Sequence, residues 1–336
     1  MLQENKNAKN LLNAVSIGLN AYETLSSIKV PVNIEGAFDN SFYINIEEDN
    51  LLRVIKYDEY ISANTLVVNH DDPDFSFKSL GISKDMEVLI QDNNLLIDNN
   101  ILLKDIDKIS IWDSPAVPDF NSVLDLESIM LNLRILRDTI YTSPSREGLV
   151  PLLENVELMG SIDLFLKSPE EGFIEKARPG IERTMWGLFS YDIKAVEEST
   201  KAIIGLGPGL TPSCDDFLAG LILSLKTGNE ILRGNGHDEE KYFNDIAETI
   251  YKSAKDKTTI FSLNMLREAC EGICPVAEIN LIYSLLTKNP EEVANQTKIL
   301  IKMGETSGAD VAIGIFYGIR FLTSRLENLE VIDAAT

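Results

Sequence analysis

The chain has 336 residues, 44% of them hydrophobic, and its 30 basic and 53 acidic residues give a formal net charge of -23. This composition predicts a globular protein of two domains, and the acidic charge argues against binding nucleic acid or an anionic membrane. With two histidines and three cysteines, neither a zinc site nor a disulfide framework is expected. The start lacks the basic and apolar regions of a secretory signal, and no apolar run is long enough to span a bilayer, which predicts a cytoplasmic protein.

The first third of the chain is predicted to be rich in β-structure. Residues 8–28 carry a loose helical pattern, but from Val30 short runs of β-branched and aromatic residues alternate with Asn, Asp and Gly. Strands are predicted at 42–46, 52–55, 66–68 and 87–90, and turns at 92–94 and 98–100. Together they predict a small, mainly antiparallel sheet that ends near Trp112. The acidic run 70–74 is interpreted as a solvated loop rather than as a cation site.

After Pro115 and Pro118 the spacing of apolar residues becomes helical, and a domain boundary is predicted there. The predicted fold class is α+β, with a small β-rich N-terminal domain, 1–115, followed by a larger, mainly α-helical domain, 116–336. A long amphipathic helix is predicted from Leu124 to Ile140. Further helices are predicted over 146–156, 182–189, 193–202, 216–226, 241–254, 262–271, 276–286, 291–303 and 310–322, with a surface loop at 228–238.

The densest local signal is Gly-Leu-Gly-Pro-Gly-Leu-Thr-Pro-Ser-Cys-Asp-Asp at 205–216, a glycine loop that leads into a helix. Glycines allow unusual backbone angles and close approach of a ligand, and N–H groups at a helix N-terminus bind anions. The stretch is therefore a candidate site for a phosphate or carboxylate. The alternative is a tight loop that only caps a core helix. The candidate binding residues are Gly205, Gly207, Gly209, Thr211 and Ser213, and the candidate catalytic residues are Asp215 and Asp216.

A second stretch repeats this chemistry before another apolar helix. When Pro212 is skipped, Thr306, Ser307, Asp310 and Gly314 align with Thr211, Ser213, Asp216 and Gly220. In each copy the Ser and the Asp have the spacing of a capping box, so two well-capped helices are one interpretation. The glycine four residues after each Asp is also expected to permit close helix packing.

A third hydroxyl-rich helix start contains Thr259 and Ser262. If the three starts converge, they form one pocket of N–H groups, hydroxyls and the carboxylates of Asp215, Asp216 and Asp310. Such a pocket suits a small anion or Mg²⁺-assisted phosphate binding, with Asp215 and Asp216 as candidate metal ligands. The lysine of a P-loop, the dinucleotide glycine pattern and a nucleophile elbow are all missing from the motif.

These three motifs, over residues 179–320, resemble the AllH family, which is linked to oxamate carbamoyltransferase. The resemblance implies a subunit that works with companion carbamoyltransferase subunits in anaerobic allantoin and purine breakdown. There, carbamoyl phosphate and oxamate interconvert with oxalurate and phosphate. The implied ligand is a small anionic substrate, and a homo-oligomer is compatible with this role. Cys214 and Glu305 stand where the family pattern usually has Gly and His.

Carbamoyl transfer from a phosphate needs hydrogen-bond donors for the phosphate and for the developing oxyanion, which helix N-termini and hydroxyls provide. Asp215 or Asp216 would accept a proton from an amide nitrogen or bind a cation. The motifs contain no arginine to clamp a carboxylate, so Arg178, Arg183 or a partner subunit is expected to supply one. The alternative function is a non-catalytic scaffold or regulatory subunit, in which the motifs serve helix capping and subunit contact.

Overall fold

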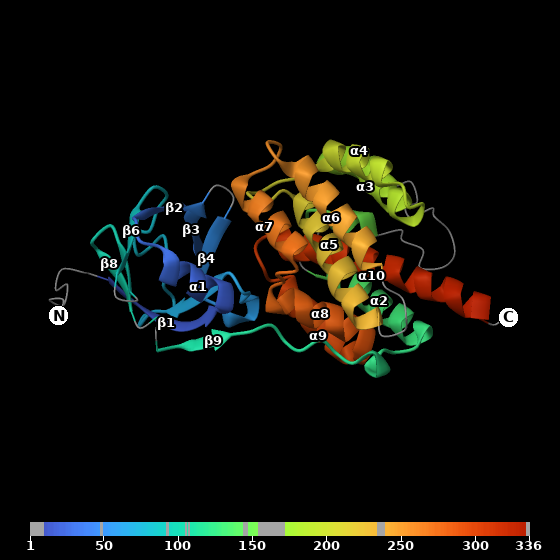
Figure 1. The fold of residues 1–336 in the computed structure, drawn as a ribbon, viewed down its shortest axis with the longest axis horizontal. Coiled ribbons are helices and arrows are strands. Elements are labelled where there is room, and N and C mark those ends of the chain that lie inside the picture. Colours follow the sequence, from blue (N-terminus) through green and yellow to red (C-terminus); the bar gives the residue numbers. More distant parts are fainter. Residues whose placement is uncertain are drawn as a thin grey trace. The chain divides into compact units, whose positions relative to one another are not determined.

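The computed structural model describes residues 10–47, 50–91, 94–104, 106, 108–143, 147–153, 172–233 and 239–333, with side chains in the last range described up to residue 326. Contacts divide the chain into two compact units, Met1–Pro115 and Ala116–Thr336. Among the described residues, the first unit contains the strands and the α-helix α1, and the second contains the remaining α-helices (Figure 1). The predicted α+β fold class, a small β-rich region followed by a larger helical region, is confirmed.

The N-terminal unit is built from strands whose pairing closes into a ring. The strands are β1 (Asn10–Gly18), β2 (Val32–Ala37), β3 (Ser41–Glu47), β4 (Asn50–Ile55), β5 (Thr65–Asn69), β6 (Glu87–Gln91), β7 (Asn94–Ile97), β8 (Ile101–Lys104) and β9 (Ser110–Trp112). Their order is β5-β4-β3-β2-β6-β7-β8-β1, and β1 pairs again with β5. Asn13 pairs with Asn69 of β5 and with Lys104 of β8, so these partners lie on opposite edges of β1. β9 continues the β8 edge, because Ser16 pairs with β5 on one side and with Ser110 on the other.

The predicted strands at 42–46, 52–55, 66–68 and 87–90 are confirmed as β3, β4, β5 and β6. Pairing is mainly antiparallel, as predicted, and the parallel pairs are β1–β8, β1–β9 and β4–β5. The helical prediction for 8–28 is wrong over its described first half, where the chain forms β1 before helix α1 (Leu19–Ser27). The reason is tertiary, because β1 closes the ring and its backbone is paired along both edges.

The predicted turn at 98–100 is confirmed, and Asp98 (φ 50°) and Asn99 (φ 54°) adopt the left-handed backbone that these residues tolerate. In the turn predicted at 92–94, the first two residues lie outside the described ones and Asn94 begins β7. The acidic run 70–74 lies in an irregular segment between β5 and β6. The core of this unit contains apolar side chains from every strand except β9, and α1 adds Ala21 and Leu25 to it.

The second unit follows the predicted helical pattern closely. Its helices are α2 (Leu126–Tyr141), α3 (Phe173–Phe189), α4 (Ile193–Ile203), α5 (Ser213–Leu232), α6 (Glu240–Ala254), α7 (Ile260–Glu271), α8 (Val276–Thr287), α9 (Pro290–Leu300) and α10 (Ser307–Asp333). Two predictions fail. The helix predicted over 146–156 is a short 3-10 turn, η3 (Val150–Leu153), in its described part. The loop predicted at 228–238 is helical up to Leu232, with 234–238 outside the described residues.

Helices α5 and α10 form the centre of this unit and run parallel. All residues of α5 from Ser213 to Leu225 are buried, so this helix is enclosed around its whole circumference. A Cβ atom on Gly220 would lie 2.1 Å from the Val311 carbonyl oxygen, and one on Gly314 would lie 2.1 Å from the Phe217 carbonyl oxygen. The predicted close packing at these glycines is confirmed, and it holds the N-terminal ends of the two helices side by side.

Helices α7 and α8 follow each other after a short turn. Gly272 ends α7 in the left-handed conformation (φ 77°), and Pro275 precedes the first residue of α8. In the described part of the chain, no helix alone is long and apolar enough to cross a membrane, and α7 and α8 meet that requirement only as a pair bent by 47°.

Candidate functional site

The structure brings together the three helix starts that the sequence singles out, those of α5, α7 and α10. The Thr211 hydroxyl, just before α5, donates to Asp216 Oδ2 at 3.2 Å and lies 2.9 Å from the hydroxyl oxygen of Ser307, the first residue of α10. The Thr258 hydroxyl, just before α7, donates to Asp215 Oδ2. The side chains at the beginning of α5 therefore connect directly to both other helices.

The glycine loop has the unusual backbone angles that its sequence predicts. Gly205, Gly207 and Gly209 have φ angles of 78°, 119° and 92°. The Gly205 N–H group donates to Asp215 Oδ1 at 2.8 Å. The first residue of the loop is therefore bound to the same carboxylate that accepts from the Thr258 hydroxyl just before α7. A Cβ atom on Gly207 would lie 2.6 Å from the Ser213 amide nitrogen, which explains why a glycine is needed at this close approach.

The tip of the loop, residues 208–210, is exposed. The Leu210 carbonyl oxygen accepts from the Thr259 hydroxyl, which in turn accepts from the Ser262 N–H group at 3.2 Å. Thr259 is thus the N-cap of α7 and also holds the loop tip. Thr259 and Ser262 both lie at the meeting point, as the converging arrangement requires.

At the starts of α5 and α10, each aspartate interacts with a hydroxyl group from its own helix start and with one from the other helix start. The hydroxyls that act on the Asp216 carboxylate belong to Thr211 in its own copy and to Ser307 in the other. Those that act on the Asp310 carboxylate belong to Thr306 in its own copy and to Ser213 in the other. The repeated Thr-Ser-Asp unit therefore forms two facing halves of one polar cluster.

A segment that sequence reasoning missed also belongs to this cluster. The Leu149 N–H group donates to Asp310 Oδ1 at 2.7 Å. A Cβ atom on Gly148 (φ 66°) would lie 2.5 Å from the same oxygen, so a larger residue would displace the carboxylate. These residues precede Asp310 by more than 160 positions and carry no motif of their own, and an isolated glycine is the only local signal.

The capping-box interpretation is wrong for α5. Its N-cap is Pro212, which offers no side-chain cap, and Ser213 is already the first helical residue. The N–H groups of Asp215 and Asp216 donate to the Pro212 carbonyl oxygen, and that of Cys214 donates to a loop carbonyl. Since these amides are occupied within the chain, recognition of an anion here would depend more on hydroxyls and carboxyl groups than predicted.

Burial dominates the electrostatics of the three aspartates. It raises the pKa of Asp310 to about 7, against the lowering effect of the Leu149 amide and two hydroxyls. It raises the pKa of Asp216 well above its usual range, and the nearby Asp310 raises it further. Burial also raises the pKa of Asp215, although hydrogen bonds from Gly205 and Thr258 oppose the change. The Cys214 thiol has a raised pKa from burial as well, so it is not a reactive thiolate.

Four buried oxygen atoms of the cluster have no hydrogen-bond partner among the described residues. They are Ser213 Oγ, Asp216 Oδ1, Ser262 Oγ and Asp310 Oδ2. All four side chains are at most 1% exposed. Leaving buried polar atoms without partners costs free energy, and such groups commonly mark a functional site.

Neither arginine expected to act as a clamp is among the described contacts of the three aspartates. Arg183 forms an exposed ion pair with Glu198 at 2.8 Å. Arg178 affects the electrostatics of Tyr317, which lies two helical turns beyond Asp310 on α10. Within the described residues, no lysine or arginine forms an ion pair with Asp215, Asp216 or Asp310.

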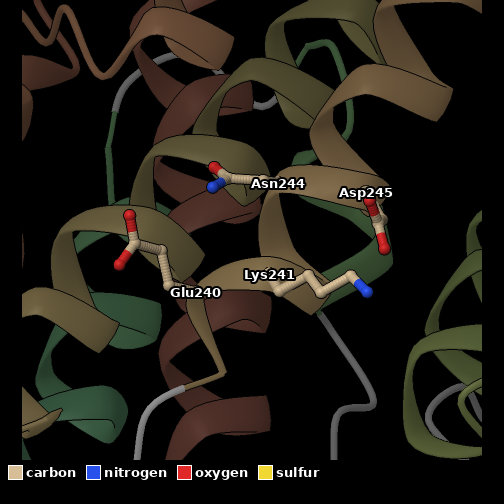
Figure 2. Close-up of a pocket in the computed structure, with 4 residues that line it drawn as sticks. All are labelled: Glu240, Lys241, Asn244 and Asp245. Atoms are coloured by element: carbon tan, nitrogen blue, oxygen red, sulfur yellow. The ribbon is translucent and has the colours of Figure 1, made fainter.

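In the described part of the chain, no group of three or more His, Cys, Asp or Glu side chains is arranged to hold a metal ion. Binding of Mg²⁺ by Asp215 and Asp216 therefore stays a prediction, and both oxygens of Asp215 already accept hydrogen bonds. A shallow hollow elsewhere, on the outer face of α6, is lined by Glu240, Lys241, Asn244 and Asp245 (Figure 2). It includes none of the predicted site residues.

The fold and the cluster define an α+β protein whose helical unit carries a buried hydroxyl and carboxyl cluster at three helix starts. The model of a protein family described as oxamate carbamoyltransferase subunit AllH matches residues 203–319. The match confirms the predicted resemblance for this segment, and it contains all three helix starts. No solved structure matches the chain.

Proposed function

We propose that this chain is a subunit of a carbamoyltransferase that interconverts carbamoyl phosphate and oxamate with oxalurate and phosphate. Its small-anion site is the cluster at the starts of α5, α7 and α10. The observation that carries the proposal is that the family match, 203–319, coincides with the segment that holds the four buried oxygens without partners. In this role the chain works in the cytoplasm with companion subunits, in anaerobic allantoin and purine breakdown.

The chemistry of the cluster suits this reaction. In oxalurate breakdown, a phosphate oxygen attacks the carbamoyl carbon, the bond from that carbon to the oxamate nitrogen breaks, and the nitrogen gains a proton. A carboxyl group whose pKa is raised by burial to about 7, as for Asp310, can give or take that proton near neutral pH. The hydroxyls of Ser213 and Ser262 lie beside the carboxyl groups of Asp310 and Asp215, whose pKa values they lower. Neither hydroxyl forms a well-aligned hydrogen bond among the described residues, so each is available to turn and donate to a substrate oxygen.

The carboxylate of oxamate needs a positively charged partner, which the cluster lacks among its described contacts. We assign this clamp to a companion subunit, because a shared site explains why the described contacts of the three aspartates include no arginine. In that arrangement this chain supplies the groups that handle the proton and the amide, and its partner neutralises the anion.

The alternative is a scaffold or regulatory subunit with no catalytic role. One observation favours it: the amides of Cys214, Asp215 and Asp216 are occupied by carbonyl oxygens of the chain itself, as they would be in a purely structural junction. The four oxygens without partners favour a ligand site instead.

Reconstitution separates the two functions. Formation of carbamoyl phosphate from oxalurate and phosphate is measured with the companion subunits, with and without this chain, and with its Asp216→Asn variant. If this chain is a catalytic subunit, the companion subunits should be inactive without it and active with the wild-type chain, and the Asp216→Asn variant should lower the rate about 100-fold. Full activity with Asp216→Asn would contradict a catalytic role.

Ligand binding gives a simpler readout. Thermal unfolding of the reconstituted complex is followed with carbamoyl phosphate, phosphate, oxamate or oxalurate at about 100 times the dissociation constant, which stabilises a protein by about 2.7 kcal/mol. The proposed site predicts a higher midpoint with at least one of these ligands, and the same complex carrying Asp216→Asn should lose the shift. No shift with any ligand would favour the scaffold.

A further inference from the structure

The three aspartates of the cluster have different hydrogen-bond states. Both oxygens of Asp215 have partners, since Oδ1 accepts from the Gly205 N–H group and Oδ2 from the Thr258 hydroxyl. Asp216 and Asp310 each have one oxygen with a partner and one, Asp216 Oδ1 and Asp310 Oδ2, without any. Asp215 is thus complete within the chain, whereas each of the other two lacks a partner for one oxygen.

The environment of Asp216 and Asp310 does not support two negative charges. Their side chains are 1% and 0% exposed, and they lie at the adjacent starts of α5 and α10, close enough for Asp310 to raise the pKa of Asp216. Their described partners are hydroxyls and one amide, and the other described titratable groups that interact with them electrostatically, Asp215 and Cys214, carry no positive charge. Two buried carboxylates without a cation repel each other and lose hydration, so one of them holds a proton.

A pair of carboxyl groups with one proton offers one hydrogen-bond donor and one acceptor. The carbamoyl or primary amide group offers the complementary set, a carbonyl oxygen and an N–H group. The pair lies between the two copies of the Thr-Ser-Asp unit, and each copy contributes one of the oxygens without a partner. The ligand chemistry that fits this arrangement is therefore an amide rather than a simple anion.

We propose that Asp216 and Asp310 share one proton and bind the carbamoyl or amide group of the substrate, the acid donating to its carbonyl oxygen and the carboxylate accepting from its N–H group. Asp215 is a positioning residue that fixes the glycine loop on the start of α7. The substrate class rests on the proposed function. During oxalurate breakdown the acid gives its proton to the departing oxamate nitrogen, and the carboxylate takes the proton that the phosphate loses. The pair again holds one proton, now on the other aspartate.

Infrared spectroscopy tests the shared proton without any activity. The C=O stretching band of a protonated carboxylic acid is measured at neutral pH in the full chain, with and without ¹³C-labelled aspartate. We expect an isotope-sensitive band in the wild type and in Asp215→Asn, and its loss in the double variant Asp216→Asn/Asp310→Asn. The matched control Asp245→Asn, on α6, should keep the band. Absence of the band in the wild type, or its persistence in the double variant, would overturn the shared proton.

Kinetics of the reconstituted enzyme separate the pair from the positioning residue. Asp216→Asn and Asp310→Asn should each lower kcat about 100-fold, because an amide cannot exchange the proton. Asp215→Asn should mainly raise KM and lower the unfolding midpoint. The Asn side chain has only one oxygen, so it can accept from the Gly205 N–H group or from the Thr258 hydroxyl but not from both. An equal loss of kcat in all three variants would overturn the assignment. An inactive wild type that shows the infrared band would contradict the proposed function alone.

Discussion

The starts of α5 and α10 are built from the same parts but are completed differently. Both have a Thr, a Ser, an Asp and a Gly in register, and both pack through the glycine. Only α5 is preceded by a glycine loop and has a second carboxylate, Asp215, where α10 has Ala309. The amide that binds Asp310 comes instead from Leu149. The shared parts hold the carboxyl pair, and the added parts fix each start to a different neighbouring segment.

The largest expected effect is a change with pH in the free energy of unfolding, caused by Asp310 at the start of α10. Burial raises the pKa of Asp310 from the ordinary 3.8 to about 7, so the protonated acid stabilises the fold. This contribution is fully present below pH 4 and is lost as the pH rises through about 7, with a total on the order of 4 kcal/mol. Chemical denaturation across this range should show a decrease in the free energy of unfolding as pH rises.

The variant Asp310→Asn isolates this contribution, because its amide stays neutral throughout and still accepts from the Leu149 N–H group. The difference between the wild type and the variant should therefore depend on pH, whereas Asp245→Asn should follow the wild type. A difference that stays constant between pH 4 and 8 would show that Asp310 is ionised in the folded protein at all these values.

The close contact between the two starts predicts the next effect. Gly314→Ala places a Cβ atom 2.1 Å from the Phe217 carbonyl oxygen, so the helices must separate, at a cost of about 3 kcal/mol in the free energy of unfolding. Gly228→Ala is the matched control, because its Cβ meets only the ends of the flexible Leu322, Ile319 and Leu286 side chains and no backbone atom, so the change should be below about 1 kcal/mol. Equal effects of the two substitutions would contradict the backbone contact.

A smaller effect is expected at the connection that only the α5 start has. Thr258→Val removes the hydroxyl that donates to Asp215 Oδ2, which leaves a buried oxygen without a partner and should cost about 1 to 2 kcal/mol. Thr249→Val is the control, since its hydroxyl bonds only to the Asp245 carbonyl oxygen of its own helix. Thermal unfolding of both variants checks this, and a Thr258→Val midpoint equal to that of the control would show that the bond is not needed.

Sequence patterns were sufficient where local spacing decides the structure. The amphipathic periods of α2, α4 and α6 and the strands β3 to β6 follow from it, because one buried face selects each element. β1 was missed because its partners β5, β8 and β9 follow it by many residues, and pairing with them outweighs a loose helical pattern. The wrong loop at Gly228 has a similar cause, since a glycine that packs against another helix resembles a turn residue in sequence.

The candidate site was predictable as a set of residues but not in its internal roles. The motif places Asp215 and Asp216 next to each other, and adjacent residues on a helix point in different directions. Only the structure distinguishes Asp215, with both oxygens partnered, from Asp216, with one oxygen free of partners. Gly148 and Leu149 could not be found at all, because no local pattern connects them to Asp310.

We propose above that the three helix starts bind the substrate as one site. Hydrogen exchange of backbone amides in the reconstituted complex, with and without oxamate and phosphate, tests it most directly. We predict slower exchange with ligand at 205–216, 258–262 and 306–310 together, and no change at 240–245 on α6. Unchanged exchange at all three starts, or slower exchange only in another part of the chain, would contradict this account.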